Sequence, residues 1–220
     1  MLFNFRHPAV IFIGIIVVLI LTYFIYYYIS MRNVKEPSYQ LIKKEGAIQI
    51  RQYAPMIVAQ VNESGDRDMA IRAGFRQLAD YIFGNNTDQA NKNTKIEMTA
   101  PVLQQNSQKI AMTAPVIQTP TETNQWQVRF VMPKTYTLAT LPKPNNPNVK
   151  VYQQAAKKFV VIVFSGSITD QNIKQHLALL KQYISKHQLN VTGSPVYAFY
   201  NPPWTLPFMR RNEILFELVE

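Results

Sequence analysis

The residues best suited to ligand chemistry in this sequence are arginines and apolar side chains with helical spacing. They lie in a segment that Ser64 or Asp66 can cap and that runs to about Phe83. Intervals of three to four residues place side chains on one face of a helix. Guanidinium groups pair with carboxylates, and a neighbouring apolar surface accepts a flat ring system. The chemistry indicated is therefore the binding of a flat anionic ligand, by Arg72, Arg76, Ala79 and Phe83.

The adjoining face of the same helix has the pattern of a core stripe. Apolar residues recur at i, i+4, i+7 and i+11, which predicts a face packed against a sheet. The arginine face has a plainer alternative interpretation, as a solvated flank with no ligand. A second contribution to a site is predicted from Arg210 and Arg211, close to an aromatic cluster near the C-terminus. The predicted stripe consists of Ile71, Phe75, Leu78 and Ile82.

Residues able to ligate a metal are few. His176 and His187 are eleven positions apart, about 16 Å along a helix, which excludes joint ligation of one iron. We interpret both as surface or boundary residues and predict no metal site. Met98 and Met112 are soft potential ligands that we interpret as core residues. The sequence contains no cysteine, which excludes disulfides, thiolate nucleophiles and thiolate-bound zinc or heme.

Motifs of common enzyme classes are missing from the sequence. There is no Ser-His-Asp order, paired-histidine zinc motif, phosphate loop or Gly-x-Gly-x-x-Gly fingerprint. Glu97 is interpreted as a solvent-facing strand residue, with a functional carboxylate as the alternative. Glu213 is predicted to pair with an arginine and fix the closing strand. The protein is therefore predicted to be a binder more readily than an enzyme, with no catalytic residue assigned.

A repeat and a series of short apolar runs define the elements that must position these residues. Residues 95–104 and 109–118 are identical at eight of ten positions, which predicts two related strands with prolines at bulges or unpaired edges. A proline-rich loop at 141–147 separates two halves that each read strand, helix, strand, strand. The other predicted elements are a hairpin over 41–50, strands at 56–61, 126–132, 149–152, 159–164, 195–200 and 214–218, and a second helix from Thr169 to about Lys186.

Three separated motifs together resemble the SOUL heme-binding protein family. They are the repeated segment, the Arg51-x-Tyr53-x-Pro55 exit of the first hairpin, and the Arg-Arg-Asn-Glu-Ile run at 210–214. The resemblance covers roughly residues 38 to 219. It implies an α+β fold, with a distorted antiparallel β-barrel built from two pseudo-twofold β-α-β-β halves. Two helices are expected to pack against this barrel.

The resemblance also implies heme or a related tetrapyrrole as ligand, held by apolar contacts and arginine-carboxylate pairing. Arg72 aligns with an arginine of the family, whereas Phe75 stands where some relatives have methionine. Two alternatives stay open: an enzyme acting on a tetrapyrrole or another small molecule, for example by metal removal, and a membrane-associated protein or lipid interaction module. The residues expected to contact the ligand are Arg72, Phe75, Arg76, Ala79, Phe83, Arg210 and Arg211.

The N-terminal region is predicted to anchor the protein in a membrane. Residues 9–29 carry no charge, and a helix formed by this segment would be long enough to cross a hydrocarbon core of about 30 Å. The predicted organisation is a tail and anchor at 1–30, a linker at 31–38 and one heme-binding domain at 39–220. The expected protein is a monomeric, single-pass protein of a bacterial inner membrane with its domain on the periplasmic side. The net charge of +10 suits acidic lipid, but the scattered cations do not suggest nucleic acid.

Overall fold

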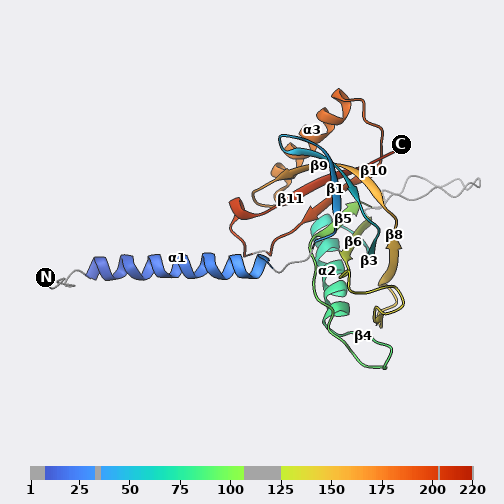
Figure 1. The fold of residues 1–220 in the computed structure, drawn as a ribbon, viewed down its shortest axis with the longest axis horizontal. Helices are drawn as coiled ribbons and strands as arrows, with labels where there is room; N and C mark the ends of the chain where they lie inside the picture. The colour runs from blue at the N-terminus through green and yellow to red at the C-terminus, as the bar shows by residue number, and fades with distance from the viewer. Residues whose placement is uncertain (1–7, 33–35, 107–124, 203, 220) are drawn as a thin grey trace, which may run out of the picture. The chain divides into compact units, whose positions relative to one another are not determined.

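The computed structural model describes residues 8–32, 36–106, 125–202 and 204–219 (Figure 1). The chain divides into two compact units, residues 1–35 and 36–220. The first unit contains one helix, α1 (Pro8–Arg32), where the sequence predicts an apolar helix. Among the described residues, however, no helix reaches the combination of length and apolarity that a membrane crossing requires. The predicted transmembrane anchor is therefore not confirmed, although the helix forms.

The second unit is an α+β domain with one large antiparallel sheet and two long helices. The sheet has nine strands in the order β1-β2-β9-β11-β10-β5-β6-β3-β8, and a small separate ladder joins β4 to β7. The helices are α2 (Arg67–Phe83) and α3 (Asp170–Lys186), with a short 3-10 helix at Pro207–Met209. The strands are β1 (Tyr39–Glu45), β2 (Ile48–Tyr53), β3 (Met56–Ser64), β4 (Asn86–Thr87), β5 (Val102–Asn106), β6 (Gln125–Val131), β7 (Lys143–Pro144), β8 (Lys150–Gln154), β9 (Lys157–Phe164), β10 (Val191–Phe199) and β11 (Asn212–Leu218).

Two short connections force the large sheet to curl. β2 and β3 are six places apart in the strand order, which would separate them by about 29 Å in a flat sheet. Only Ala54 and Pro55 connect them, and the three steps from Tyr53 to Met56 span at most about 11 Å. β8 and β9 are also six places apart and are joined by residues 155–156 alone. The ends of the sheet must therefore approach each other.

The sheet is curled into a half-barrel, which confirms in part the distorted antiparallel β-barrel that the family resemblance implies. β1 and β8 stand at the two ends of the strand order, so the ladder is not closed between them. All residues of β1 are exposed, and Lys43 and Lys44 on this strand are typical of an edge protected against further pairing. The pseudo-twofold relation between the two halves stays a prediction.

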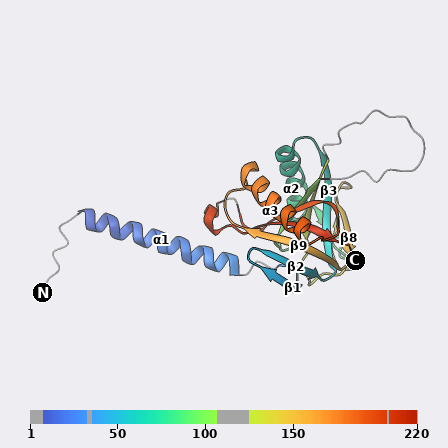
Figure 2. The same ribbon diagram turned by 90° about the horizontal axis from the view of Figure 1, so that it is seen from above.

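Both long helices cover the same, convex side of the curled sheet. α2 packs against β3 and β6, whereas α3 packs against β9 and β11. Figure 2 shows the two helices along one side of the domain and the β1–β2 hairpin along the opposite side. Each helix covers its own apolar cluster, with Leu78 and Val128 fully buried in one, and Leu180 and Ile214 in the other. Burial of such side chains stabilises the fold by roughly 1.5–3 kcal/mol each.

The helix boundaries follow from local sequence signals. Thr169 caps α3, because its hydroxyl accepts a hydrogen bond from the Asn172 amide. Asp66 occupies the N-cap position of α2 but makes no side-chain capping bond. Gly84 ends α2 with a φ of 129°, a conformation that glycine adopts without steric cost. The predicted extents of both helices are confirmed.

The repeated segment is a strand only in part. In the first copy, β5 begins after Pro101, so the proline precedes the ladder and removes no hydrogen bond from it. β5 then pairs with β10 and β6 at the centre of the sheet. Met98 is 41% exposed, which makes its interpretation as a core residue wrong, and Glu97 is exposed but outside a strand. The second copy, with Met112, lies outside the described residues.

Candidate functional site

The predicted ligand face of α2 forms on the outer side of the helix. Arg72 and Arg76 are exposed, Ala79 is partly buried and Phe83 is 60% exposed. The sheet-facing side of α2 lies elsewhere on the helix, so these four side chains are available together to a ligand. The residues buried against the sheet are Ala70, Gly74, Leu78, Tyr81 and Ile82.

Phe75 belongs to this outer face more than to the predicted core stripe. Its side chain is 39% exposed, and its ring meets Phe130 edge-on with 5.2 Å between centroids. The cause is Gly74, where an added Cβ would come within 2.7 Å of Val128. The absence of a side chain lets α2 approach the sheet most closely at Gly74. The buried face is therefore centred one residue away from the predicted stripe, and Phe75 lies at its border.

The closing segment does not join the α2 face. The Arg211 guanidinium binds Glu213 at 2.7 Å and Glu36 at 3.0 Å, and it lies 4.1 Å from the Tyr200 ring centroid. The adjacent Arg210 donates from Nε to the Thr205 carbonyl oxygen. Arg210 is thus engaged within its own segment, and Arg211 is engaged by Glu213 and by Glu36 from the start of the domain. The prediction that they help to hold the same ligand as α2 is not supported by these contacts.

Strand alternation explains the separation. Ile214 and Phe216 of β11 point into the core beneath α3, so Glu213 points to the other face of the sheet. The Arg211 guanidinium binds Glu213 and therefore lies on that same face. α2 lies on the convex side, whereas Arg211 is bound on the concave side. The sequence places these residues near aromatic neighbours but carries no signal for the face that they occupy.

Arg51 and Glu213 form the centre of a buried polar network on the concave face. Arg51 Nη1 donates to both carboxylate oxygens of Glu213, at 3.0 and 2.9 Å, and to the Tyr53 hydroxyl at 2.9 Å. The Tyr200 hydroxyl donates to the same carboxylate at 2.8 Å. Arg51 is 1% exposed and Glu213 is fully buried. The predicted pairing of Glu213 with an arginine is confirmed, and Arg211 is its second partner.

Burial and the network shift several pKa values. Burial alone would lower the pKa of the Arg51 guanidinium, but hydrogen bonds and charge from Glu213 outweigh it and raise that pKa. Burial, followed by the charge of Glu213, raises the pKa of Tyr53 to about 12. The pKa of Tyr200 is also raised, mainly by burial. Both tyrosines are therefore neutral at physiological pH; the Tyr53 hydroxyl accepts from Arg51, and the Tyr200 hydroxyl donates to Glu213.

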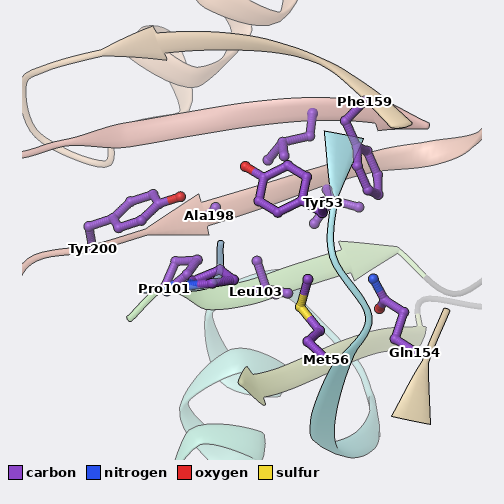
Figure 3. Close-up of a pocket in the computed structure, with 11 residues that line it drawn as sticks. Tyr53, Met56, Pro101, Leu103, Gln154, Phe159, Ala198 and Tyr200 are labelled. Atoms are coloured by element: carbon purple, nitrogen blue, oxygen red, sulfur yellow. The ribbon is translucent and has the colours of Figure 1, made fainter. Parts of the chain in front are cut away.

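An apolar cleft opens beside this network (Figure 3). Seven strands contribute to its lining, from β2 near one end of the strand order to β8 at the other. The hydroxyls of Tyr53 and Tyr200 point toward one another, near Ala198. The cleft is therefore a product of the curl. Sequence reasoning missed it, and its only local signal is the Arg51-x-Tyr53 spacing, which places two side chains on one face of a strand.

Sequence comparison decides the family. The model of the SOUL heme-binding protein family matches residues 34–217, which is most of the chain. The chain belongs to the SOUL heme-binding protein family. Among its relatives, mouse heme-binding protein 2 is 27% identical over 190 residues, covering 84% of each chain. Human heme-binding protein 2 is 30% identical over 172 residues, covering 77% of each.

Solved structures agree with the SOUL domain at the level of the fold. The EcmrR C-terminal domain superposes with a TM-score of 0.57 and 14% identity, over 83% of this chain and 98% of that domain. A hydrolase from Listeria innocua gives a TM-score of 0.51 and 12% identity, over 81% and 94% of the two chains. At identities this low, the superpositions show a shared fold alone and do not indicate a shared chemistry.

The described part of this SOUL domain contains no cluster of side chains that would hold a metal ion. Within those residues, no group of three or more His, Asp or Glu side chains could hold a metal ion. His176 lies in the second turn of α3 and His187 is its C-cap, and both side chains are half-buried, as predicted for boundary residues. The His176 ring stacks on Phe164 with 4.1 Å between centroids, and His187 lies 3.7 Å from Glu45. Both rings are therefore held in local contacts.

Proposed function

We propose that this protein binds heme or a related tetrapyrrole on the outer face of α2. The observation that carries the proposal is the combination of two exposed arginines with exposed aromatic surface on one helix face of a SOUL domain. An exposed Phe83 has no role in the core, and large apolar side chains exposed beside polar ones are typical of binding surfaces. The names of the mouse and human relatives support heme as the ligand.

The chemistry of this face fits a flat molecule with carboxylates at one edge. Arg72 and Arg76 are four residues apart, about 6 Å along the helix axis, so two guanidinium groups project side by side. Phe75, Ala79 and Phe83 supply apolar surface to the macrocycle. The arginines bind carboxylates through charge-assisted hydrogen bonds and orient the ring over the apolar surface. Heme bound in this way supplies its own redox and ligand chemistry, whereas the protein supplies position.

Retention without strong axial ligation suits a carrier. The histidines within the described residues lie on α3, away from α2, and both are engaged locally. Apolar contact and carboxylate pairing then provide the affinity, and such a ligand can be passed to an acceptor without breaking a strong iron bond. Sequestration or transfer is therefore the function that the site supports best.

A heme titration followed by absorbance tests this proposal. The full-length protein should show a saturable, one-to-one spectral change that Arg72→Ala with Arg76→Ala weakens at least tenfold. Lys174→Ala with Lys181→Ala removes the same number of exposed cations from α3 and should leave affinity within twofold. An equal loss of heme affinity in both double variants would mean that affinity depends on net charge and not on the α2 arginines. Recovery of the tetrapyrrole unchanged, checked by mass spectrometry, separates binding from turnover.

We infer in addition that α1 associates with a membrane. Support comes from its large apolar side chains between Val10 and Tyr26, most of which are 40–65% exposed. Full-length protein should sediment with membranes and resist an alkaline carbonate wash, whereas Ile15→Glu with Leu19→Glu should release it. A periplasmic position of the domain predicts an active alkaline phosphatase fusion at the C-terminus.

A further inference from the structure

The loop between β10 and β11, residues 200–211, exposes large apolar side chains to solvent. Trp204 and Phe208 are each 69% exposed, and Leu206 is 38% exposed. The sequence has no charged residue from 202 to 209. Large apolar side chains that are grouped on a surface mark interaction sites, whereas single ones need no explanation. The loop therefore has the composition of a contact surface.

A second loop extends this apolar surface. Residues 165–169 join β9 to α3, and the Gly166 amide donates to the Pro207 carbonyl oxygen at 2.9 Å. The Asn212 side-chain amide donates to the Gly166 carbonyl oxygen at 3.0 Å, which ties the second loop to the start of β11. Ile168 on this second loop is 37% exposed. The two joined loops form an apolar tip at one end of the sheet, which consists of Ile168, Trp204, Leu206 and Phe208.

Hydrogen bonds hold the β10–β11 loop in a fixed shape. Thr205, between the exposed side chains, is only 1% exposed, and its carbonyl oxygen accepts from Arg210 Nε at 2.8 Å. The Thr205 amide donates to the Pro202 carbonyl oxygen at 3.1 Å, and the 3-10 helix Pro207–Met209 follows. A surface that is already ordered loses little conformational entropy when it binds. The fold therefore presents the apolar side chains ready for contact.

The base of this loop is tied to the first described residue of the domain. The Arg211 guanidinium binds Glu36 at 3.0 Å, and the Arg211 amide donates to Asn201 Oδ1 at 2.6 Å. Only residues 33–35 separate Glu36 from Arg32, the last residue of α1. Four residue steps span at most about 14 Å. The chain that leaves α1 therefore enters the domain at the base of the β10–β11 loop.

These observations favour a lipid bilayer as the partner that covers the apolar tip. Near its C-terminal end α1 carries three consecutive tyrosines, Tyr26, Tyr27 and Tyr28, and such aromatic residues are enriched where a membrane segment meets water. Tryptophan, phenylalanine and leucine are the side chains that interfacial segments bury in a bilayer. With this end of α1 at a bilayer surface, the short connection to Glu36 keeps the base of the loop near the same surface.

We propose that the apolar tip inserts into the interface of a lipid bilayer. This inference rests on the membrane association of α1 proposed above and adds a second point of contact to it. Insertion buries Trp204 and Phe208 at the boundary between head groups and acyl chains, where interfacial apolar faces lie about 5–10 Å deep. Contact at a second point fixes which side of the domain faces the bilayer.

Tryptophan fluorescence tests this insertion, because the chain has only two tryptophans, Trp126 and Trp204. Full-length Trp126→Phe and full-length Trp204→Phe are each reconstituted into phosphatidylcholine vesicles, with and without bromine on the upper part of the acyl chains. Bromine quenches tryptophans that touch the lipid. In Trp126→Phe, where Trp204 alone emits, bromine should remove more than half of the emission.

Trp204→Phe is the matched control, since Trp126 lies away from the tip. Phe199, which precedes the β10–β11 loop, pairs with Val102 at the start of β5, whereas Trp126 pairs with Asn106 at the end of β5. Four residues of strand separate the two ends by about 14 Å. The emission of Trp126 should therefore be nearly the same with and without bromine.

Two further substitutions, made in the Trp126→Phe protein, test the role of the tip. Phe208→Asp should reduce the bromine quenching of Trp204 at least about threefold, because a carboxylate enters a bilayer at high cost. Leu138→Asp changes another exposed apolar side chain, 48% exposed and outside the tip, and should leave the quenching unchanged. If Trp126→Phe unfolds less cooperatively than the unaltered protein, ¹⁹F spectra of the unaltered chain labelled with fluorotryptophan replace it, with a lipid-borne nitroxide as the quencher.

Sedimentation with the vesicles separates this proposal from the one on α1. Protein that sediments but shows equal quenching of Trp126 and Trp204 would retain the association of α1 and overturn the insertion of the tip. Equal quenching in Phe208→Asp and Leu138→Asp would overturn it as well. Protein that stays in the supernatant would contradict both proposals. A shift of Trp204 emission that follows protein concentration and needs no lipid would mean that a second copy of the chain covers the tip, and the bilayer would be the wrong partner.

Discussion

Arg51 and Glu213 stand 162 positions apart in the chain, yet their side chains meet at 2.9 Å in the interior of the curled sheet. Each comes from a motif that resembles the SOUL family, the hairpin exit and the closing strand. β2 and β11 are not neighbours in the sheet, because β9 lies between them. The pair therefore reaches across β9, and it joins the first and the last of the family motifs in one buried contact.

Removal of the Glu213 charge should strongly destabilise the domain. Glu213→Gln leaves the buried Arg51 and the half-buried Arg211 without their shared carboxylate, which should cost about 3–5 kcal/mol in the free energy of unfolding. Glu217→Gln, on the same strand, breaks only the partly exposed pair with Lys157 and should cost at most about 1 kcal/mol. Chemical denaturation of both variants measures the difference. Similar losses of unfolding free energy in the two variants would mean that the buried pair contributes no more to stability than the partly exposed pair.

Stability should fall at high pH through Tyr53. Its pKa is about 12 in the folded protein against 10.0 as the ordinary value, so the unfolded chain loses this proton first. The contribution is therefore complete below pH 10 and is lost as pH rises toward 12, by about 3 kcal/mol in total. Other tyrosines and the lysines titrate in the same range, so the comparison is with Tyr53→Phe. Unfolding free energies from pH 8 to 12 should show a shallower decline in the variant, and parallel profiles would contradict this cause.

Gly74→Ala should destabilise the protein even though alanine favours helices. Its Cβ would lie 2.7 Å from Val128 Cγ2 and 3.0 Å from Val61 Cγ2. Overpacking costs about 1–3 kcal/mol, which the helix propensity of alanine offsets by about 1 kcal/mol. Thermal unfolding should show a net loss on the order of 1 kcal/mol. Val128→Ala should cost less in the Gly74→Ala background than alone, and simple additivity would rule out the clash.

The two halves of the domain should not fold separately. β3 precedes the proline-rich loop but pairs with β8, which follows it. β2 also precedes the loop and pairs with β9, which follows it, so strands of each half pair with strands of the other half. β5 likewise pairs with β10, so in a fragment of residues 36–146 three strands each lack one partner, as do three strands in a fragment of 147–220. Dispersed NMR spectra are expected only when the two fragments are mixed. A folded single fragment would show that the exchanged pairings are dispensable.

Local patterns by themselves determined most of the helices and strands. The stripe of α3 and its Thr169 cap, the glycine that ends α2, and the apolar run of β9 each depend on neighbouring residues, so they can be read from the sequence. The family also follows from motifs, because residue identities alone carry it. Sequence reasoning missed the shifted face at Phe75, since the close approach at Gly74 depends on Val61 and Val128 from two distant strands.

The tertiary structure alone decided how the candidate sites are divided. Arginines 72 and 76 remain exposed on the convex side, whereas Arg211 is held by Glu36 and Glu213 on the concave side. Which face a strand residue occupies depends on register and curl, and the curl results from two short links between strands at opposite ends of the sheet. The cleft lies at that convergence. The residues that line it come from strands far apart in sequence, so no local pattern could specify it.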